Sequence, residues 1–186
     1  MGYLFDPVTL HEISKKGVGL PFEGMVSVVS DELSRAYPGH IETTPNWIFS
    51  LAGGATGIMT ILHASLSEYV IIFGTPVGTE GFSGRYHIDI YDYVMAGEMR
   101  TYTEQDVGEA KVSGPGEWQI LNRGQVKGFK LPEAVWLLEY GRGPIFTALP
   151  MALGDAVFSG MDATTIVRTL WNYGKLATRE LFRGKI

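Results

Sequence analysis

The sequence contains no cysteine, so disulfide bonds, thiolate nucleophiles and thiolate metal ligands are all excluded. Charged residues are scarce as well, at 19% of the 186 residues, whereas hydrophobic residues make up 45%. The formal net charge of −5 gives no sign of the basic surface that binds nucleic acid, and no such partner is expected. The chain is long enough to bury a sizeable core, and residues 1–186 are most simply one domain.

No apolar run is long enough to cross a bilayer. The best candidate, GIMTILHASLSEYVIIFG, holds polar residues including His63 and Glu68 near its middle and alternates as β-strands do. The first residues, MGYLFDPVTLHEISKK, lack the basic start and apolar segment of a signal peptide. We therefore expect any contact with a membrane to involve a surface of the folded protein.

The common metal and phosphate motifs are also missing. His11, His40, His63 and His87 show no metal-ligand spacing, so no metal site is expected, and His63 is interpreted as a hydrogen-bonded core histidine. The glycine-rich GTEGFSGR lacks the lysine and the following helix of a phosphate-binding loop.

Glycine is abundant, with 24 residues. Between residues 47 and 143, glycine-containing turns such as AGG, GPGE and NRGQ separate short β-type runs, which predicts an antiparallel barrel or sandwich. Residues 1–46 are predicted to be a helical segment, and residues 144–186 two further helices. We expect a mainly β fold with flanking helices.

The last predicted helix is basic and amphipathic. Its cations are Arg168, Lys175, Arg179 and Arg183, and its apolar side includes Ile166, Leu170 and Leu181. Such a helix can lie in a membrane interface with its cations at the lipid headgroups. The alternative is an ordinary surface helix that packs on the barrel. The preceding segment IFTALPMALGDAVF has no charge before Asp155, and this favours a membrane-facing pair of helices.

Two carboxylates fall on apolar faces of predicted strands. Both faces of AVWLLEYG are apolar, so Glu139 is expected to be buried, and Asp92 lies on the apolar face of HIDIYDYVMAG. Tyr69 in SEYVIIFG places a phenol in the same interior. Two buried acids that lie close together share a proton and supply a general acid and a general base. The alternatives are an ion pair of Glu139 with Arg142, and a turn or edge position that exposes Asp92 to solvent.

Unusual residue combinations recur along the whole chain. They are GYLFDP, YPGHI, AGGATG, ILHASLSEYVIIFGT, GTEGFSGR, LLEYGRG, DAVFSGMD and the terminal GKI. In this order they resemble the family of the fungal sterol Δ8–Δ7 isomerase and the type-1 sigma receptor. GYLFDP, GTEG and GKI are closer to the isomerase branch.

The resemblance implies a cupin-like β-barrel, without the metal of cupins, closed on one side by two C-terminal helices that lie against a membrane. It implies that Glu139 meets the cationic centre of a ligand inside the barrel, that Asp92 hydrogen-bonds this glutamate, and that Tyr69 orients it. The positions that correspond to the pocket lining are Met59, Ile71, Phe73, Ile90 and Leu149. Ala55, Leu121 and Leu131 stand where the receptor has larger or more polar pocket residues, which suits a flat hydrocarbon.

We therefore expect a sterol isomerase of sterol (ergosterol) biosynthesis that moves a ring double bond from Δ8 to Δ7. Glu139 and Asp92 would be its catalytic pair, and no cofactor is needed because only protons move. The expected partners are a sterol substrate, lipophilic cationic amines as inhibitors, a membrane surface and further copies in a homotrimer.

The family's transmembrane helix normally precedes GYLFDP and is not found in this chain, so the expected location is a membrane surface, that of the endoplasmic reticulum in a eukaryote. One alternative is a non-enzymatic, sigma-receptor-like binder of amines or sterols. The other is a structural module whose acids pair with Arg85 or Arg142.

Overall fold

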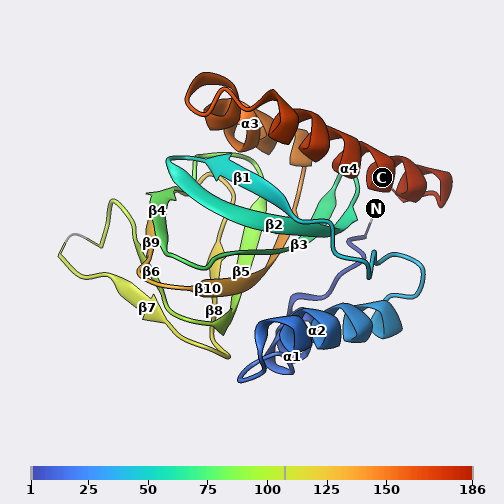
Figure 1. Ribbon diagram of the computed structural model, residues 1–186, viewed down its shortest axis with the longest axis horizontal. Coiled ribbons are helices and arrows are strands. Elements are labelled where there is room, and N and C mark those ends of the chain that lie inside the picture. The colour runs from blue at the N-terminus through green and yellow to red at the C-terminus, as the bar shows by residue number, and fades with distance from the viewer. Residues whose placement is uncertain (1, 107, 186) are drawn as a thin grey trace.

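The computed structural model describes residues 2–106 and 108–185, which place helices at both ends of the chain around a body of strands (Figure 1). The strands are β1 (Ile48–Ala52), β2 (Ala55–Ala64), β3 (Glu68–Thr75), β4 (Thr79–Phe82), β5 (Asp89–Ala96), β6 (Met99–Tyr102), β7 (Lys111–Ser113), β8 (Trp118–Leu121), β9 (Gly128–Leu131) and β10 (Val135–Arg142). They form an antiparallel six-stranded sheet, β1-β2-β3-β10-β5-β8, and a four-stranded sheet, β4-β9-β6-β7. The expected mainly β fold with flanking helices is confirmed.

Strand β10 lies inside the larger sheet, between β3 and β5. Its residues Leu138 and Tyr140 point outward into a core shared with the N-terminal helices. Its residues Leu137 and Glu139 point inward, into a cavity between the two sheets. Because each face of β10 meets its own apolar environment, the strand carries apolar side chains on both faces.

The N-terminal helices cover the outer face of the larger sheet. They are α1 (Pro7–Lys15) and α2 (Phe22–Ala36). Asp6 caps the N-terminus of α1, because its carboxylate accepts a hydrogen bond from the Thr9 amide at 2.8 Å. The apolar stripe of α2, including Met25, Val29 and Leu33, is buried against the sheet.

The turn between β1 and β2 ties the two sheets together. The amide of Phe82, at the end of β4, donates to the Gly53 carbonyl at 2.8 Å. Gly53 has a φ of 62°, and a Cβ there would lie 2.0 Å from the Phe82 carbonyl oxygen. Only glycine fits this close approach.

The C-terminal helices lie on the other side of the β-strands from α1 and α2 (Figure 1). They are a 3₁₀ turn, η1 (Ile145–Ala148), then α3 (Leu149–Phe158) and α4 (Ala163–Phe182). Helix α3 packs on β1, and α4 packs on β1 and β2. Large apolar side chains remain on their surface, with Phe158 89%, Trp171 73% and Phe182 90% exposed. No helix in the described ranges is long and apolar enough to cross a membrane.

Two arginines, Arg168 in α4 and Arg183 directly after it, form hydrogen bonds to other parts of the chain. Arg168 donates to the Trp47 carbonyl at 2.9 Å, and Arg183 donates to the Gly39 carbonyl. These hydrogen bonds attach α4 to the segment that joins α2 to β1. Because these two arginines are directed toward the protein, apolar side chains make up a larger share of the exposed surface of α4 than the sequence pattern suggested.

A buried glutamate holds both ends of the chain against the sheet. Glu68, at the start of β3, is fully buried and accepts hydrogen bonds from the amide of Leu4 at 2.8 Å and from the hydroxyl of Tyr140 at 2.6 Å. The Nζ atom of Lys185 lies 2.5 Å from Oε2 of Glu68. One carboxylate thus satisfies donors from the N-terminal segment, β10 and the C-terminal segment.

We expect the substitution Glu68→Gln to lower the free energy of unfolding by about 3–5 kcal/mol, because it leaves Lys185 without its buried partner. The amides of Leu4 and Phe5 should also exchange faster with deuterated water. Chemical unfolding and hydrogen exchange measure these effects, and Glu80→Gln, at an exposed position on β4, is the control. Equal stability of Glu68→Gln and the wild type would contradict this assignment.

Candidate active site

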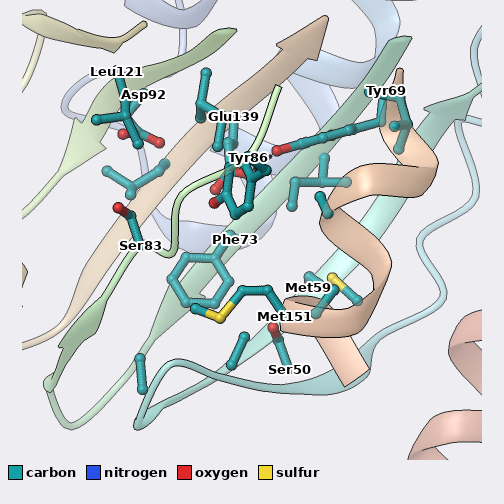
Figure 2. A pocket seen from close by; sticks show the side chains of 18 of the residues that line it. Ser50, Met59, Tyr69, Phe73, Ser83, Tyr86, Asp92, Leu121, Glu139 and Met151 are labelled. Atoms are coloured by element: carbon teal, nitrogen blue, oxygen red, sulfur yellow. Dashed lines mark hydrogen bonds between the residues drawn. The ribbon is translucent and has the colours of Figure 1, made fainter. Parts of the chain in front are cut away.

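A cavity lies between the two sheets and is bounded by residues of α3 and α4 (Figure 2). Most of its lining is aliphatic or aromatic. The five lining residues expected from the family resemblance, Met59, Ile71, Phe73, Ile90 and Leu149, all face it. The helices contribute Met151 and Tyr173, among others. An apolar cavity with a few polar groups is the usual form of a small-molecule site.

The three substituted positions behave differently. Ala55 and Leu121 line the cavity, as expected. Leu131 instead belongs to the apolar core around Val94 and Val135, and it is not among the described lining residues. Leu131 therefore adds no room to the cavity directly, and this part of the interpretation is wrong.

Glu139 and Asp92 face each other across neighbouring strands. They are register partners in the β10–β5 pair, and both side chains reach the cavity. Cβ atoms of such partners lie about 4.5–5.5 Å apart. Asp92 is only 5% exposed, and β5 runs between β10 and β8, so the alternative of a solvent-exposed turn or edge position is wrong.

Tyr69 orients Glu139. Its hydroxyl, which points toward Glu139 in Figure 2, donates to Glu139 Oε1 at 2.6 Å. The cause of this geometry is the β3–β10 register, in which Tyr69 pairs with Gly141. A side chain on Gly141 would collide with the Tyr69 ring, 2.2 Å from its Cβ position, so glycine leaves the space that the phenol crosses.

The environment of Glu139 favours its protonated form. Burial first, and then the negative charge of Asp92, raise the pKa of Glu139 to about 7, although the Tyr69 hydrogen bond and the Lys127 charge act in the opposite direction. Burial also raises the pKa of Tyr69 well above its usual value, so this phenol keeps its proton and remains a donor. Glu139 can therefore gain and lose a proton close to neutral pH.

Lys127 is the charged residue that the sequence analysis missed. Its ammonium group forms an ion pair with Asp92 Oδ2, and the residue is 8% exposed. It precedes β9, so it reaches Asp92 from the smaller sheet across the cavity. A lysine beside a glycine-containing turn gives no sequence signal of burial, and only the packing of the two sheets reveals it. Tyr86 and Ser83, whose side chains appear beside the acids in Figure 2, were missed for the same reason.

Neither arginine considered as a partner reaches the acids. Arg142 contacts Asp89, with Nε 3.5 Å from Oδ2, and lies over the Tyr91 ring at 5.1 Å. Arg85 pairs with Glu104 at 3.0 Å. The alternative in which the buried acids pair with Arg85 or Arg142 is therefore wrong.

The arrangement provides two carboxyl groups with different roles. Glu139 is held in an apolar site with a neutral donor, whereas Asp92 has a cation beside it. A carboxyl that titrates near neutral pH next to a second carboxylate is suited to moving protons. The net charge of the cavity varies between zero and about minus one as Glu139 titrates, because Lys127 offsets Asp92. The described lining contains no histidine, so the metal-ligand set of a metal cupin is not present there.

Comparisons with known proteins relate the whole chain to one family. A family model described as ERG2 and Sigma1 receptor like protein matches residues 1–185. The C-8 sterol isomerase ERG2 of Gibberella zeae is 37% identical over 99% of this chain and 79% of its own length. The sigma non-opioid intracellular receptor 1 of Gallus gallus is also 37% identical, over 93% of this chain and 78% of its own length.

Among solved structures, an RmlC-like cupin from Shewanella frigidimarina aligns with 54% of this chain and 85% of its own, with 18% identity and a TM-score of 0.45. The sequence relatives cover almost the whole chain and include both an isomerase and a receptor. By the family match over residues 1–185, this chain belongs to the ERG2 and sigma-1 receptor-like family.

Proposed function

We propose that this protein is a sterol isomerase that moves a ring double bond from Δ8 to Δ7. The observation that carries the proposal is the position of Glu139, a carboxyl with a pKa of about 7 opposite Asp92 in an apolar cavity. Fungal relatives at 37% identity are named C-8 sterol isomerases, which supports the same reaction.

In the proposed mechanism, Glu139 donates its proton to carbon 9 of the Δ8 sterol. The π electrons of the carbon 8–carbon 9 bond form the new C–H bond, and a tertiary cation remains at carbon 8. Asp92 then removes a proton from carbon 7, and the electrons of that C–H bond form the carbon 7–carbon 8 double bond. Exchange with water between turnovers resets both acids: Asp92 loses the proton that it took, and Glu139 gains a new one. In each turnover the sterol therefore gains one proton at carbon 9 and loses one at carbon 7.

The surroundings of the two acids suit this sequence of steps. Glu139 becomes negative as the carbocation forms, and an anion in a site of low dielectric stabilises a nearby cation strongly. The apolar walls also keep water from trapping the cation. Lys127 forms an ion pair with Asp92, and the Tyr69 hydroxyl donates a hydrogen bond to Glu139. These contacts favour Glu139 as the acid and Asp92 as the base, a choice that the sequence left open.

We also propose that the exposed side chains of α3 and α4 bind a membrane surface. Residues with large exposed apolar side chains, such as Phe158, Met161, Trp171 and Phe182, lie on these helices or between them. The inner sides of the same helices line the cavity. A sterol dissolved in a bilayer would then have a short path between the membrane and the cavity.

A second candidate function is the binding of lipophilic amines without catalysis. The Gallus gallus receptor is as similar to this chain as the fungal isomerases are. A protonated amine and a carbocation both require an anion in an apolar site, so Glu139 and Asp92 would serve either ligand. Conversion of a Δ8 sterol by the purified protein separates the two functions, since only the isomerase forms a Δ7 product.

We expect Glu139→Gln to lower the rate of sterol isomerisation by about 10²–10⁴-fold, because an amide keeps the shape of the carboxyl but cannot transfer its proton. The measurement is single-turnover conversion followed by chromatography. The same change at Glu133, which is exposed, should leave the rate unchanged. Near-normal turnover of Glu139→Gln would remove this residue from the mechanism.

The pKa of Glu139 predicts a pH dependence of stability. In the folded protein Glu139 holds its proton until about pH 7, whereas an unfolded chain releases it near the ordinary value of 4.5. Between these values the folded state binds more protons, so its stability falls as pH rises, by at most about 1.4 kcal/mol per pH unit. Below pH 4.5 and above pH 7 this contribution is constant.

Chemical unfolding of the wild type and of Glu139→Gln across pH 4–8 measures this dependence. The difference between the two free energies should decline through that window, because the amide does not titrate. Parallel curves would show that Glu139 has an ordinary pKa.

The membrane proposal predicts that the wild-type chain floats with liposomes and that Trp171→Glu with Phe182→Glu weakens binding at least about tenfold, through loss of buried apolar area. Leu170 is left intact because it also lines the cavity. Val8→Glu, an equally drastic change at an exposed position on α1, is the control. Flotation that is unaffected by the double substitution would place the membrane contact elsewhere.

A further inference from the structure

Three side chains of metal-binding type meet outside the cavity. His40 follows α2, His63 lies on β2 and Glu180 lies near the end of α4, and one donor atom from each lies within 4.8 Å of the others. His63 and Glu180 are fully buried, whereas the His40 side chain is 26% exposed. None of the three is among the described lining residues of the cavity, so the proposed isomerase reaction does not use them.

His63 presents an unused lone pair to this cluster. Its Nδ1 atom lies 2.9 Å from the His40 carbonyl oxygen. A carbonyl only accepts, so Nδ1 carries the hydrogen and Nε2 carries the lone pair. Within the described residues, Nε2 is buried and has no hydrogen-bond partner. A histidine that donates one ring N–H to a backbone carbonyl and keeps the other nitrogen free has the arrangement of a metal ligand with its outer-shell support.

The unpartnered Nε2 atom has an energetic cost. A buried acceptor without a hydrogen-bond partner is destabilising, and a metal ion would satisfy it.

Glu180 supplies the anionic ligand. Its Oε2 atom lies 2.6 Å from His40 Nδ1, and its Oε1 atom accepts a hydrogen bond from Arg183 at 3.2 Å. Arg183 and Arg179 oppose a cation here, but Arg179 also lies 3.7 Å from Glu42, so two carboxylates balance the two guanidinium groups. A locally neutral site with two imidazoles favours a transition metal over calcium or magnesium, which need more oxygen ligands.

We infer that His40, His63 and Glu180 form a binding site for a divalent transition metal, with Zn²⁺ as the best match to two imidazoles and one carboxylate. Tetrahedral zinc with bonds of about 2.0–2.1 Å requires donors roughly 3.4 Å apart, so the cluster must contract around the ion. His40 allows this because it lies in the segment between α2 and β1, which has no helix or strand. The partly exposed side of His40 is the route for the ion and for a water as fourth ligand.

The metal would join three distant parts of the chain. It would connect the end of α4 to β2 and to the segment after α2, where Arg183 already donates to the Gly39 carbonyl. Because α4 bounds the cavity, metal binding should stabilise the helix that covers the site.

The test uses untagged, metal-free full chain titrated with Zn²⁺ by calorimetry and with Co²⁺ by visible absorption, which reports tetrahedral geometry. The absence of cysteine leaves only nitrogen and oxygen ligands to account for any signal. We expect one ion per chain and a melting temperature that rises with Zn²⁺ until the site is full.

His40→Ala is the main variant, because the partial exposure of His40 limits the folding defect that this change can cause. His63→Gln is the second variant. Each should weaken Zn²⁺ binding by more than the roughly 10–100-fold that loss of an outer-shell partner costs. His87→Ala, an exposed histidine outside the cluster, should bind as the wild type does. A wild type without stoichiometric binding, or a His40→Ala variant with unchanged affinity, would overturn the inference.

Discussion

The burial of Glu139 between β3 and β5 is the interaction on which the rest of the site depends. A carboxylate in an apolar cavity costs several kcal/mol unless it is protonated or paired, and the close hydrogen-bond donor that the described residues offer Glu139 is the neutral hydroxyl of Tyr69. The outcome is a proton held until about pH 7. The larger sheet makes this possible because the N-terminal helices cover its outer face and leave its inner face for the cavity.

The second acid differs from the first because of a single contact. Asp92 forms an ion pair with Lys127, which arrives from the smaller sheet, whereas Glu139 accepts a hydrogen bond from the neutral hydroxyl of Tyr69. One carboxyl group of the pair therefore has a cation beside it, and the other has a neutral donor and a raised pKa. That asymmetry suits the proposed acid and base, which act on carbons 9 and 7, the two ring neighbours of carbon 8 in one substrate.

The fold was predictable where local patterns decide it. Three features follow from local patterns in the sequence. They are the Asp6 cap of α1, the apolar stripe of α2, and the alternation of apolar residues in β3, β5 and β10. The same alternation placed Glu139 and Asp92 on inward faces, and the family resemblance supplied Tyr69 and the cavity lining.

The contacts between distant segments were not predictable from these patterns. Lys127 lies beside a turn, where no alternation of apolar residues marks it as buried. Its pairing with Asp92 therefore becomes visible only when the two sheets are packed together. In the same way, His40, His63 and Glu180 have no ligand spacing in the sequence, because a loop, a strand and a helix bring them together. Leu131 shows a different kind of error: the resemblance assigned this residue to the pocket, but it lies in the apolar core.

The most direct test of the account is the isomerisation of a Δ8 sterol in deuterated water, with the product analysed by mass spectrometry and NMR. If Glu139 delivers an exchangeable proton and Asp92 removes another, the Δ7 product carries one deuterium, at carbon 9. Unconverted Δ8 sterol, or a Δ7 product without deuterium at that carbon, would contradict proton transfer from Glu139 as the function of this cavity.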